Sequence, residues 1–138
     1  MERYYQPEIE CASREQIKAW QDERLVKQVQ HVWEHMPYYR KKMEAKGLTP
    51  ADIKGTEDLY KLPFLSKADL REAYPYGLLA KPLKDCVRIQ STSGTTGKRV
   101  VAFYTQHDID LWEDCCARAI MAAGGTDEDV CQVSYGYG

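Results

Sequence analysis

A polar loop, Ser91–Lys98, most constrains how this 138-residue chain can fold. Val87–Gln90 before it and Val100–Tyr104 after it are short and rich in residues that favour strands. Within eight positions the loop holds five hydroxyl groups, two glycines and a lysine. The segment therefore predicts a strand, a glycine-containing turn and a second strand.

A capped helix is predicted to follow the second strand. Thr105 and Asp108 form a capping-box-like start, and the helix is expected to run to about Ala123, where Gly124–Gly125 ends it. Its cysteines are expected to be buried as small hydrophobic residues. The predicted apolar face consists of Ile109, Trp112, Cys115, Cys116, Ala119, Ile120 and Ala123. Val130–Ser134 then predicts a third strand.

The first half of the chain has a helical pattern instead. Ser13 and Gln16 form a capping box at the start of a helix that Pro37 ends or kinks. The apolar stripe of this helix is Ile17, Trp20, Val26, Val29, Trp33 and Met36. A second helix is expected over Tyr38–Lys46, with Gly47 as its cap. A short helical turn is expected from Thr49–Pro50, and an extended segment at Leu62–Phe64. Ser66 and Asp69 then cap another short helix, which Pro75 stops.

These patterns give an α/β fold class, with the fragment itself α+β. A mainly helical subdomain is expected over residues 1–80, and the start of an α/β domain over residues 81–138. Three strands and one covering helix make an incomplete sheet, and the sequence stops directly after an apolar stretch. We therefore expect these residues to be the N-terminal part of a longer protein.

The composition excludes several classes of function. The formal net charge is −2 and basic residues cluster only locally, so no nucleic-acid partner and no anionic membrane surface are expected. No apolar run approaches the roughly 20 residues that a membrane span needs. Five cysteines, an odd number without a C-x-x-C pair, indicate reduced thiols and a cytoplasmic location.

The loop has the residues that binding of a polyphosphate requires. Glycines let the backbone bring N–H groups close to an anion, hydroxyl groups donate to phosphate oxygens, and Lys98 adds a positive charge. The arrangement is not a Walker A motif, because the glycines are three positions apart, Arg99 follows the lysine and a strand follows the loop. From composition alone, a surface loop without function remains the alternative.

A second motif, His31–His35, matches the H-x-x-E-H pattern of inverted zinc peptidases. Trp33 within it belongs to the apolar stripe, and no third ligand is recognisable downstream. We interpret the match as two polar residues beside a core stripe and expect no metal site there.

The loop sequence S-T-S-G-T-T-G-K resembles the phosphate-binding loop of the acyl-adenylating superfamily. Blocks on both sides of it resemble the phenylacetate–coenzyme A ligase branch, and the resemblance covers the chain from about Tyr38. These blocks are Leu62–Phe64, Lys67–Arg71, Tyr74–Gly77, Val87–Ile89 and Tyr135–Gly138.

The resemblance implies an adenylate-forming, ATP-dependent aryl-acid–coenzyme A ligase. In this family phenylacetate, ATP and coenzyme A give phenylacetyl-CoA, AMP and pyrophosphate through an acyl-adenylate. Tyr135 and Tyr137 are placed by the resemblance at the aryl pocket, with packing beside a glycine turn as the alternative. Arg99 departs from the family, which commonly has proline at this position. The residues expected to contact ATP or pyrophosphate are Ser93, Gly94, Thr95, Thr96, Gly97 and Lys98.

By the same resemblance, the ligands of Mg²⁺, the adenine pocket and the catalytic lysine would follow this segment. No catalytic residue and no metal ligand is therefore expected within it, and the chain alone is expected to be inactive. Exposed apolar surface predicts a homo-oligomer. Two alternatives stay open: a related adenylating enzyme for another acid, and a non-enzymatic module for binding or assembly.

Overall fold

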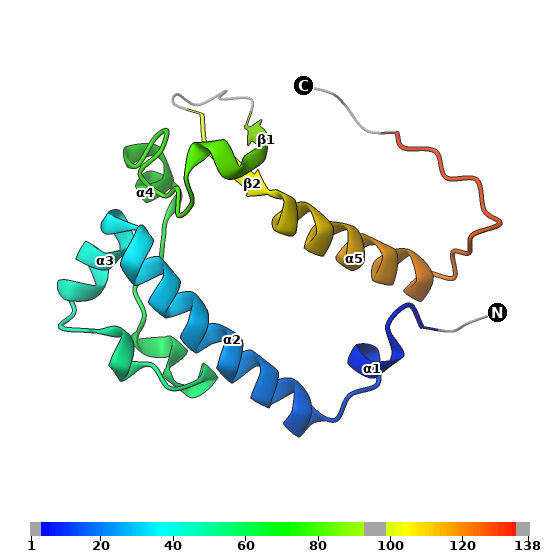
Figure 1. Ribbon diagram of the computed structural model, residues 1–138, viewed down its shortest axis with the longest axis horizontal. Helices are drawn as coiled ribbons and strands as arrows, with labels where there is room; N and C mark the ends of the chain where they lie inside the picture. The colour runs from blue at the N-terminus through cyan, green and yellow to red at the C-terminus, as the bar shows by residue number, and fades with distance from the viewer. Residues whose placement is uncertain (1–3, 93–98, 135–138) are drawn as a thin grey trace.

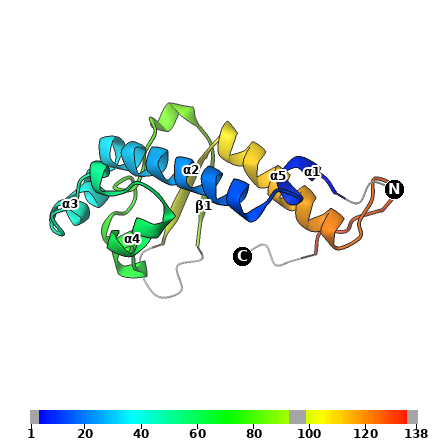
Figure 2. The ribbon, with the colours of Figure 1, turned by 90° about the horizontal axis from the view of Figure 1, so that it is seen from below.

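The computed structural model describes residues 4–92 and 99–134. Its two long helices, α2 (Arg14–His35) and α5 (Gln106–Ala122), run in opposite directions (Figures 1 and 2). Most of the remaining elements gather where α2 ends and α5 begins. They are α1 (Pro7–Glu10), α3 (Pro37–Glu44), α4 (Lys67–Glu72), the 3₁₀ helices η1 (Pro50–Asp52), η2 (Thr56–Lys61) and η3 (Leu83–Asp85), and the strands β1 (Cys86–Ser91) and β2 (Val101–Thr105).

Helix α2 begins and ends where the sequence predicts. The Ser13 hydroxyl accepts a hydrogen bond from the Gln16 N–H (3.2 Å), and the helix stops at His35, two residues before Pro37. The predicted apolar stripe is wrong at Val26, which is 38% exposed. Leu25, one position earlier, packs against the core instead. At about 100° per residue, Leu25 and Val26 lie on opposite sides of Val29 around the helix, and the core lies on the Leu25 side.

Helix α3 ends in a glycine cap, as predicted. The Gly47 N–H donates to the Glu44 carbonyl (2.9 Å) and the Leu48 N–H donates to the Met43 carbonyl (3.0 Å). Gly47 has a φ of 70°, the left-handed conformation that this pair of hydrogen bonds requires. The cap turns the chain so that Leu48 returns to the core beside Met43.

The core is a small cluster between α2 and the segments that follow it. Val29, Met43 and Ile53 are 4%, 0% and 2% exposed, respectively. The partly buried residues around them are Leu25, Trp33, Tyr39, Leu48 and Leu62. No polar or charged residue is buried in the part of the chain that the structure describes.

Strands β1 and β2 form an antiparallel hairpin in which Ile89 lies opposite Phe103 and Ser91 lies opposite Val101. Both strands were predicted, but the third was not found: Val130–Ser134 has no strand structure, and Val130 is 99% exposed. A strand needs a neighbour with which to exchange backbone hydrogen bonds. Across residues 4–92 and 99–134, β1 and β2 pair only with each other.

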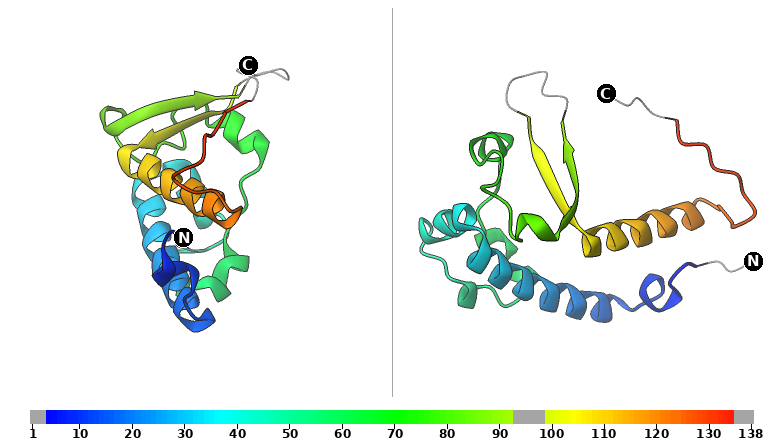
Figure 3. Two further views of the ribbon diagram at one scale, coloured as in Figure 1. Left: turned by 90° about the vertical axis from the view of Figure 1, so that its right-hand side faces the viewer. Right: turned by 45° about the horizontal axis from the view of Figure 1, so that its top comes forward.

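Helix α5 has the predicted capping box, but its predicted apolar face is largely uncovered. Thr105 and Asp108 form the reciprocal cap, and Ile109 in the first turn is only 7% exposed. Trp112 and Ile120 are 42% and 54% exposed. The prediction that Cys115 and Cys116 are buried is wrong, because both are exposed. The helix packs against β2 at its start and extends beyond the hairpin (Figure 3), so the described chain covers this face only in the first turns of the helix.

Candidate functional site

The predicted phosphate loop connects the two strands of the hairpin. At its base, the Thr92 N–H donates to the Val100 carbonyl (3.0 Å), and the Val100 N–H donates to the Thr92 hydroxyl (3.2 Å). These hydrogen bonds hold the two ends of the loop side by side. The six residues expected to contact phosphate, Ser93, Gly94, Thr95, Thr96, Gly97 and Lys98, lie outside the described residues.

Aromatic rings contact the hairpin on both of its faces. On one face, Trp112 of α5 stacks with Tyr104 (ring centroids 5.6 Å apart) and lies under the Arg88 guanidinium at 5.9 Å. On the other face, Tyr76 packs against Phe103, with their centroids 5.6 Å apart. Because side chains alternate across a strand, these contacts come from opposite sides. The hairpin is therefore fixed relative to both α5 and the segment after α4.

A groove of about 710 Å³ lies along the Phe103 face of the hairpin, between β2 and α2. Its polar residues include His31, Lys81, His107 and Asp108. Hydrogen bonds from the Thr105 N–H and hydroxyl lower the pKa of Asp108, and burial and the nearby Lys81 lower the pKa of His31. Asp108 is occupied by the helix cap, so it is poorly placed to act as a general base.

The H-x-x-E-H motif places two histidine rings together without completing a metal site. His31 and His35 have ring centroids 4.7 Å apart, as expected for residues one turn apart on α2. His35 also lies 3.9 Å from the Glu34 carboxylate. Among the residues that the structure describes, no group of three or more potential ligands is placed to hold a metal ion.

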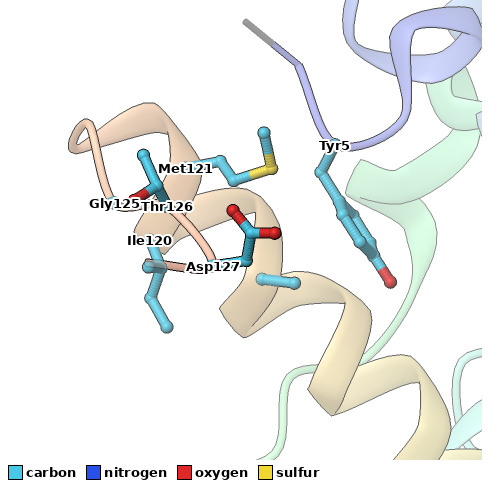
Figure 4. A pocket seen from close by; sticks show the side chains of 7 residues that line it. Tyr5, Ile120, Met121, Gly125, Thr126 and Asp127 are labelled. Carbon is cyan, nitrogen blue, oxygen red and sulfur yellow. The ribbon is translucent and has the colours of Figure 1, made fainter. Parts of the chain in front are cut away.

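A second, more apolar pocket lies at the far end of α5 (Figure 4). It has a volume of about 570 Å³, with Tyr5 on one side and Met121 and Asp127 on the other. The Tyr5 hydroxyl donates to the Asp114 carboxylate (3.2 Å), which ties the N-terminal segment to α5. At a rise of 1.5 Å per residue, the pocket is roughly 20 Å from the start of α5 and so is separate from the loop.

Tyr135 and Tyr137, the residues predicted for the aryl pocket, also lie outside the described residues. The segment before them, residues 130–134, is described as irregular chain. The described part of the chain therefore shows the base of the loop, and the predicted contact residues of both groups lie outside it.

Comparison with known proteins finds relatives in sequence. No family model matches the chain. The chain is 47% identical over 130 residues to a phenylacetate-coenzyme A ligase of Aromatoleum evansii, covering 94% of this chain. The corresponding enzymes of Escherichia coli and Thermus thermophilus are 45% and 42% identical, over 94% and 97% of the chain. The chain is therefore similar to phenylacetate-coenzyme A ligases over nearly its whole length. It spans about 30% of the length of these relatives.

Solved structures with the same fold are also coenzyme A ligases. A 2-hydroxyisobutyryl-CoA ligase in complex with 2-HIB-AMP and CoA has a TM-score of 0.79 and 30% identity, over 87% of this chain and 26% of that one. The same enzyme in its postadenylation state, with 2-HIB-AMP, has a TM-score of 0.80 and 28% identity. The chain therefore shares its arrangement of helices and hairpin with part of this coenzyme A ligase.

The sequence patterns did not predict the contacts that hold the hairpin. Tyr76 lies in one of the blocks that resemble the ligase branch, but no contact was predicted for it. Asp69 was predicted only as a helix cap. The alternation of β2 could have indicated that Phe103 and Tyr104 face opposite sides. Nothing in the sequence indicates that Tyr76, which lies 27 positions away from Phe103, supplies the partner ring.

Proposed function

We propose that this chain supplies the phosphate-binding loop of an ATP-dependent aryl-acid–coenzyme A ligase. The observation that carries the proposal is its similarity to phenylacetate-coenzyme A ligases over 94–97% of its length. The hairpin supports it, because hydrogen bonds at Thr92 and Val100 bring the ends of the hydroxyl-rich loop together. Such a loop can place N–H, hydroxyl and lysine donors around a polyphosphate.

In the proposed reaction an aryl carboxylate attacks the α-phosphate of ATP, giving an acyl-adenylate and pyrophosphate, and coenzyme A then displaces AMP. Tyr135 and Tyr137 would contact the aryl group. Mg²⁺ would be held by residues of the ligase outside this segment. Residues 1–80 would form a helical subdomain and residues 81–138 the start of the adenylate-forming domain. The loop residues Ser93, Gly94, Thr95, Thr96, Gly97 and Lys98 would offset the charge of the β- and γ-phosphates.

Carboxylate-dependent exchange of pyrophosphate into ATP tests this proposal. The assay is run on the longest reading frame that contains this chain, with the 138-residue chain beside it. We expect exchange with phenylacetate in the longer protein and none in the chain alone. Absence of exchange with every aryl acid in both proteins would overturn the ligase proposal and favour a module for binding or assembly.

A lysine pair provides the matched variants for this assay. We expect Lys98→Met to lower the exchange rate by roughly a hundredfold, because the transition state loses a positive charge beside the departing pyrophosphate. Lys84→Met removes the same charge from η3, away from the loop, and is expected to leave the rate unchanged. Equal exchange rates for the two variants would show that Lys98 does not act at the phosphate site.

A related acid is the second candidate substrate, because the structural neighbours are named for 2-hydroxyisobutyrate, which has no aryl ring. A panel of aryl and short aliphatic acids in the same exchange assay separates the two. A preference for phenylacetate over 2-hydroxyisobutyrate would support the aryl-acid proposal. A preference for 2-hydroxyisobutyrate would instead indicate a ligase for short aliphatic acids.

We also propose that the 138-residue chain self-associates through exposed apolar side chains. Phe64 is 90% exposed, and on α5 both Leu111 (50%) and Ile120 (54%) face solvent. Apolar surface of this kind favours association. Light scattering at increasing protein concentration is expected to show a mass above 15.9 kDa. A constant monomer mass would contradict this proposal.

A further inference from the structure

The Asp69 carboxylate is the most heavily hydrogen-bonded side chain among those described. It accepts from the Ser66 N–H and hydroxyl (both 2.6 Å), from the Tyr38 hydroxyl (2.9 Å) and from the Lys42 ammonium. Its side chain is 16% exposed. Hydrogen bonds from Lys42 and Ser66 hold the pKa of Asp69 well below its usual range, so the group is a carboxylate at any ordinary pH.

These hydrogen bonds join two helices. Ser66 belongs to the cap of α4, whereas Tyr38 and Lys42 are on α3. Tyr38 also donates to Glu72 at the end of α4 (3.2 Å), so both ends of the short helix are held against α3. Burial and these hydrogen bonds to Asp69 and Glu72 raise the pKa of Tyr38 to about 12. In the ribbon, α4 lies between α3 and the hairpin (Figures 1 and 3).

The segment after α4 is tightly built and leads directly to the hairpin. Ala73 is 8% exposed, and the Gly77 N–H donates to its carbonyl (2.7 Å). A Cβ on Gly77 would lie 2.7 Å from that same oxygen, so only glycine allows this close turn. Tyr76, inside the turn, packs against Phe103, which is two residues from Val101 at the end of the loop. A displacement of α4 would therefore move Tyr76, and through its contact with Phe103 it would also move the base of the loop.

We propose that Asp69 is a positioning residue for the phosphate loop. By holding α4 on α3, its carboxylate fixes Tyr76 against Phe103 and so keeps the base of the loop in one place. The effect on the loop base follows from the contacts alone, whereas its consequence for ATP binding rests on the proposed function.

Hydrogen exchange at the base of the loop tests the structural step in the chain itself. Asp69→Asn keeps the shape of the side chain but removes its charge and one acceptor. We expect the Thr92 amide, which donates to Val100, to exchange roughly tenfold faster in this variant. The Leu48 amide, bonded to Met43 in the core, reports global unfolding and is expected to keep its rate. The readout needs no ligand and no activity.

Asp52→Asn is the matched control. Asp52 accepts from the Thr49 N–H (2.8 Å) and hydroxyl (2.7 Å), the same kind of cap, but on η1, which packs against α2. We expect Asp52→Asn to leave the hydrogen exchange rate of the Thr92 amide unchanged. Tyr76→Leu, which leaves Asp69 intact, is expected to speed exchange at Thr92 as Asp69→Asn does. Equal Thr92 rates in Asp69→Asn, Asp52→Asn and the unchanged chain would overturn the proposal.

The functional step is measured separately in the longer reading frame. There Asp69→Asn is expected to raise the KM for ATP severalfold while leaving the KM for the carboxylate unchanged, because only the phosphate loop is displaced. A general loss of stability would lower the active fraction and change neither KM. If the unchanged protein shows no pyrophosphate exchange, the ligase proposal fails, while the exchange rates at Thr92 still decide whether Asp69 positions the loop. An equal rise in both KM values would contradict a role specific to the phosphate loop.

Discussion

One small motif recurs along the chain: a serine or threonine followed three residues later by an aspartate. In each case the aspartate carboxylate accepts hydrogen bonds from the backbone N–H and the hydroxyl of the earlier residue. The four pairs are Thr49–Asp52, Ser66–Asp69, Thr105–Asp108 and Thr126–Asp129. Each motif starts a turn or helix from local sequence alone, so short elements form despite a small core.

Asp22 differs from these caps because its main partners are remote in sequence. It accepts from the Thr56 N–H and hydroxyl and from Lys18, all at 2.7 Å, and so joins α2 to η2. The hydrogen bonds from Lys18 and Thr56 lower the pKa of Asp22 to about 2. A depressed pKa stabilises the fold above the unfolded value of about 3.9, and this contribution is lost as the pH falls toward 2.

We therefore predict a pH-dependent effect of Asp22→Asn. Urea unfolding at pH 5 is expected to show a clear loss of stability in the variant, and at pH 2.5 a smaller one, because the original carboxyl is then partly protonated. Other carboxyl groups titrate in both proteins, so the difference between them isolates Asp22. The same difference at both pH values would contradict the assigned pKa.

A second prediction at this scale concerns Gly47. Its φ of 70° suits glycine, and an added Cβ would meet no atom within 4 Å. Gly47→Ala is therefore expected to cost only the conformational penalty, about 1 kcal/mol of unfolding free energy. Ala45→Gly, at an ordinary helical φ of −62°, tests the opposite exchange and should also destabilise by roughly 0.5–1 kcal/mol. A stabilising Gly47→Ala variant would show that this turn is not left-handed in solution.

At the scale of elements, helices with local start and stop signals were predicted well. Ser13, Thr105 and the glycines after α3 and α5 mark the ends observed in the structure. α1 and η2 were not predicted, because short turns without a periodic apolar pattern give little signal. Burial along α5 was predicted incorrectly, because an apolar face shows that a helix can be covered, but not whether anything covers it.

The exposure of α5 predicts the reactivity of its thiols. Cys115 and Cys116 are exposed, as are Cys11 and Cys131, whereas Cys86 at the start of β1 is partly covered. At a protein concentration low enough to keep the chain monomeric, we expect Ellman's reagent to modify four thiols rapidly and the fifth more slowly in the folded chain, and all five at one rate in urea. The double variant Cys115→Ser, Cys116→Ser should have two fewer thiols that react rapidly. Slow reaction at both positions would mean that self-association covers this face.

At the scale of the whole molecule, the apolar cluster of Val29, Met43 and Ile53 joins α2, α3 and the segment after η1. The hairpin and α5 contribute little to it and are held instead by aromatic contacts and by capped turns. The helical part and the hairpin part therefore depend on different interactions. The division near residue 80 stays a prediction.

Met43→Ala measures the contribution of the core. Met43 is completely buried, so the variant is expected to lose about 2–5 kcal/mol of unfolding free energy. Val26→Ala on α2, at a side chain that is 38% exposed, should change stability by no more than about 0.5 kcal/mol. Urea denaturation followed by circular dichroism compares the two, and similar losses would mean that the cluster is not the stabilising core.

The sequence by itself determined the caps, the long helices, the hairpin and the resemblance to a ligase family, because these depend on neighbouring residues or on motifs that are contiguous in the chain. Only the tertiary structure decided that Val130–Ser134 lacks a strand partner, that Cys115 and Cys116 face solvent, and that Asp69 binds Tyr38 and Lys42. Each of these depends on what lies across space from a residue. A linear pattern records what a side chain can do, and packing decides which partner it meets.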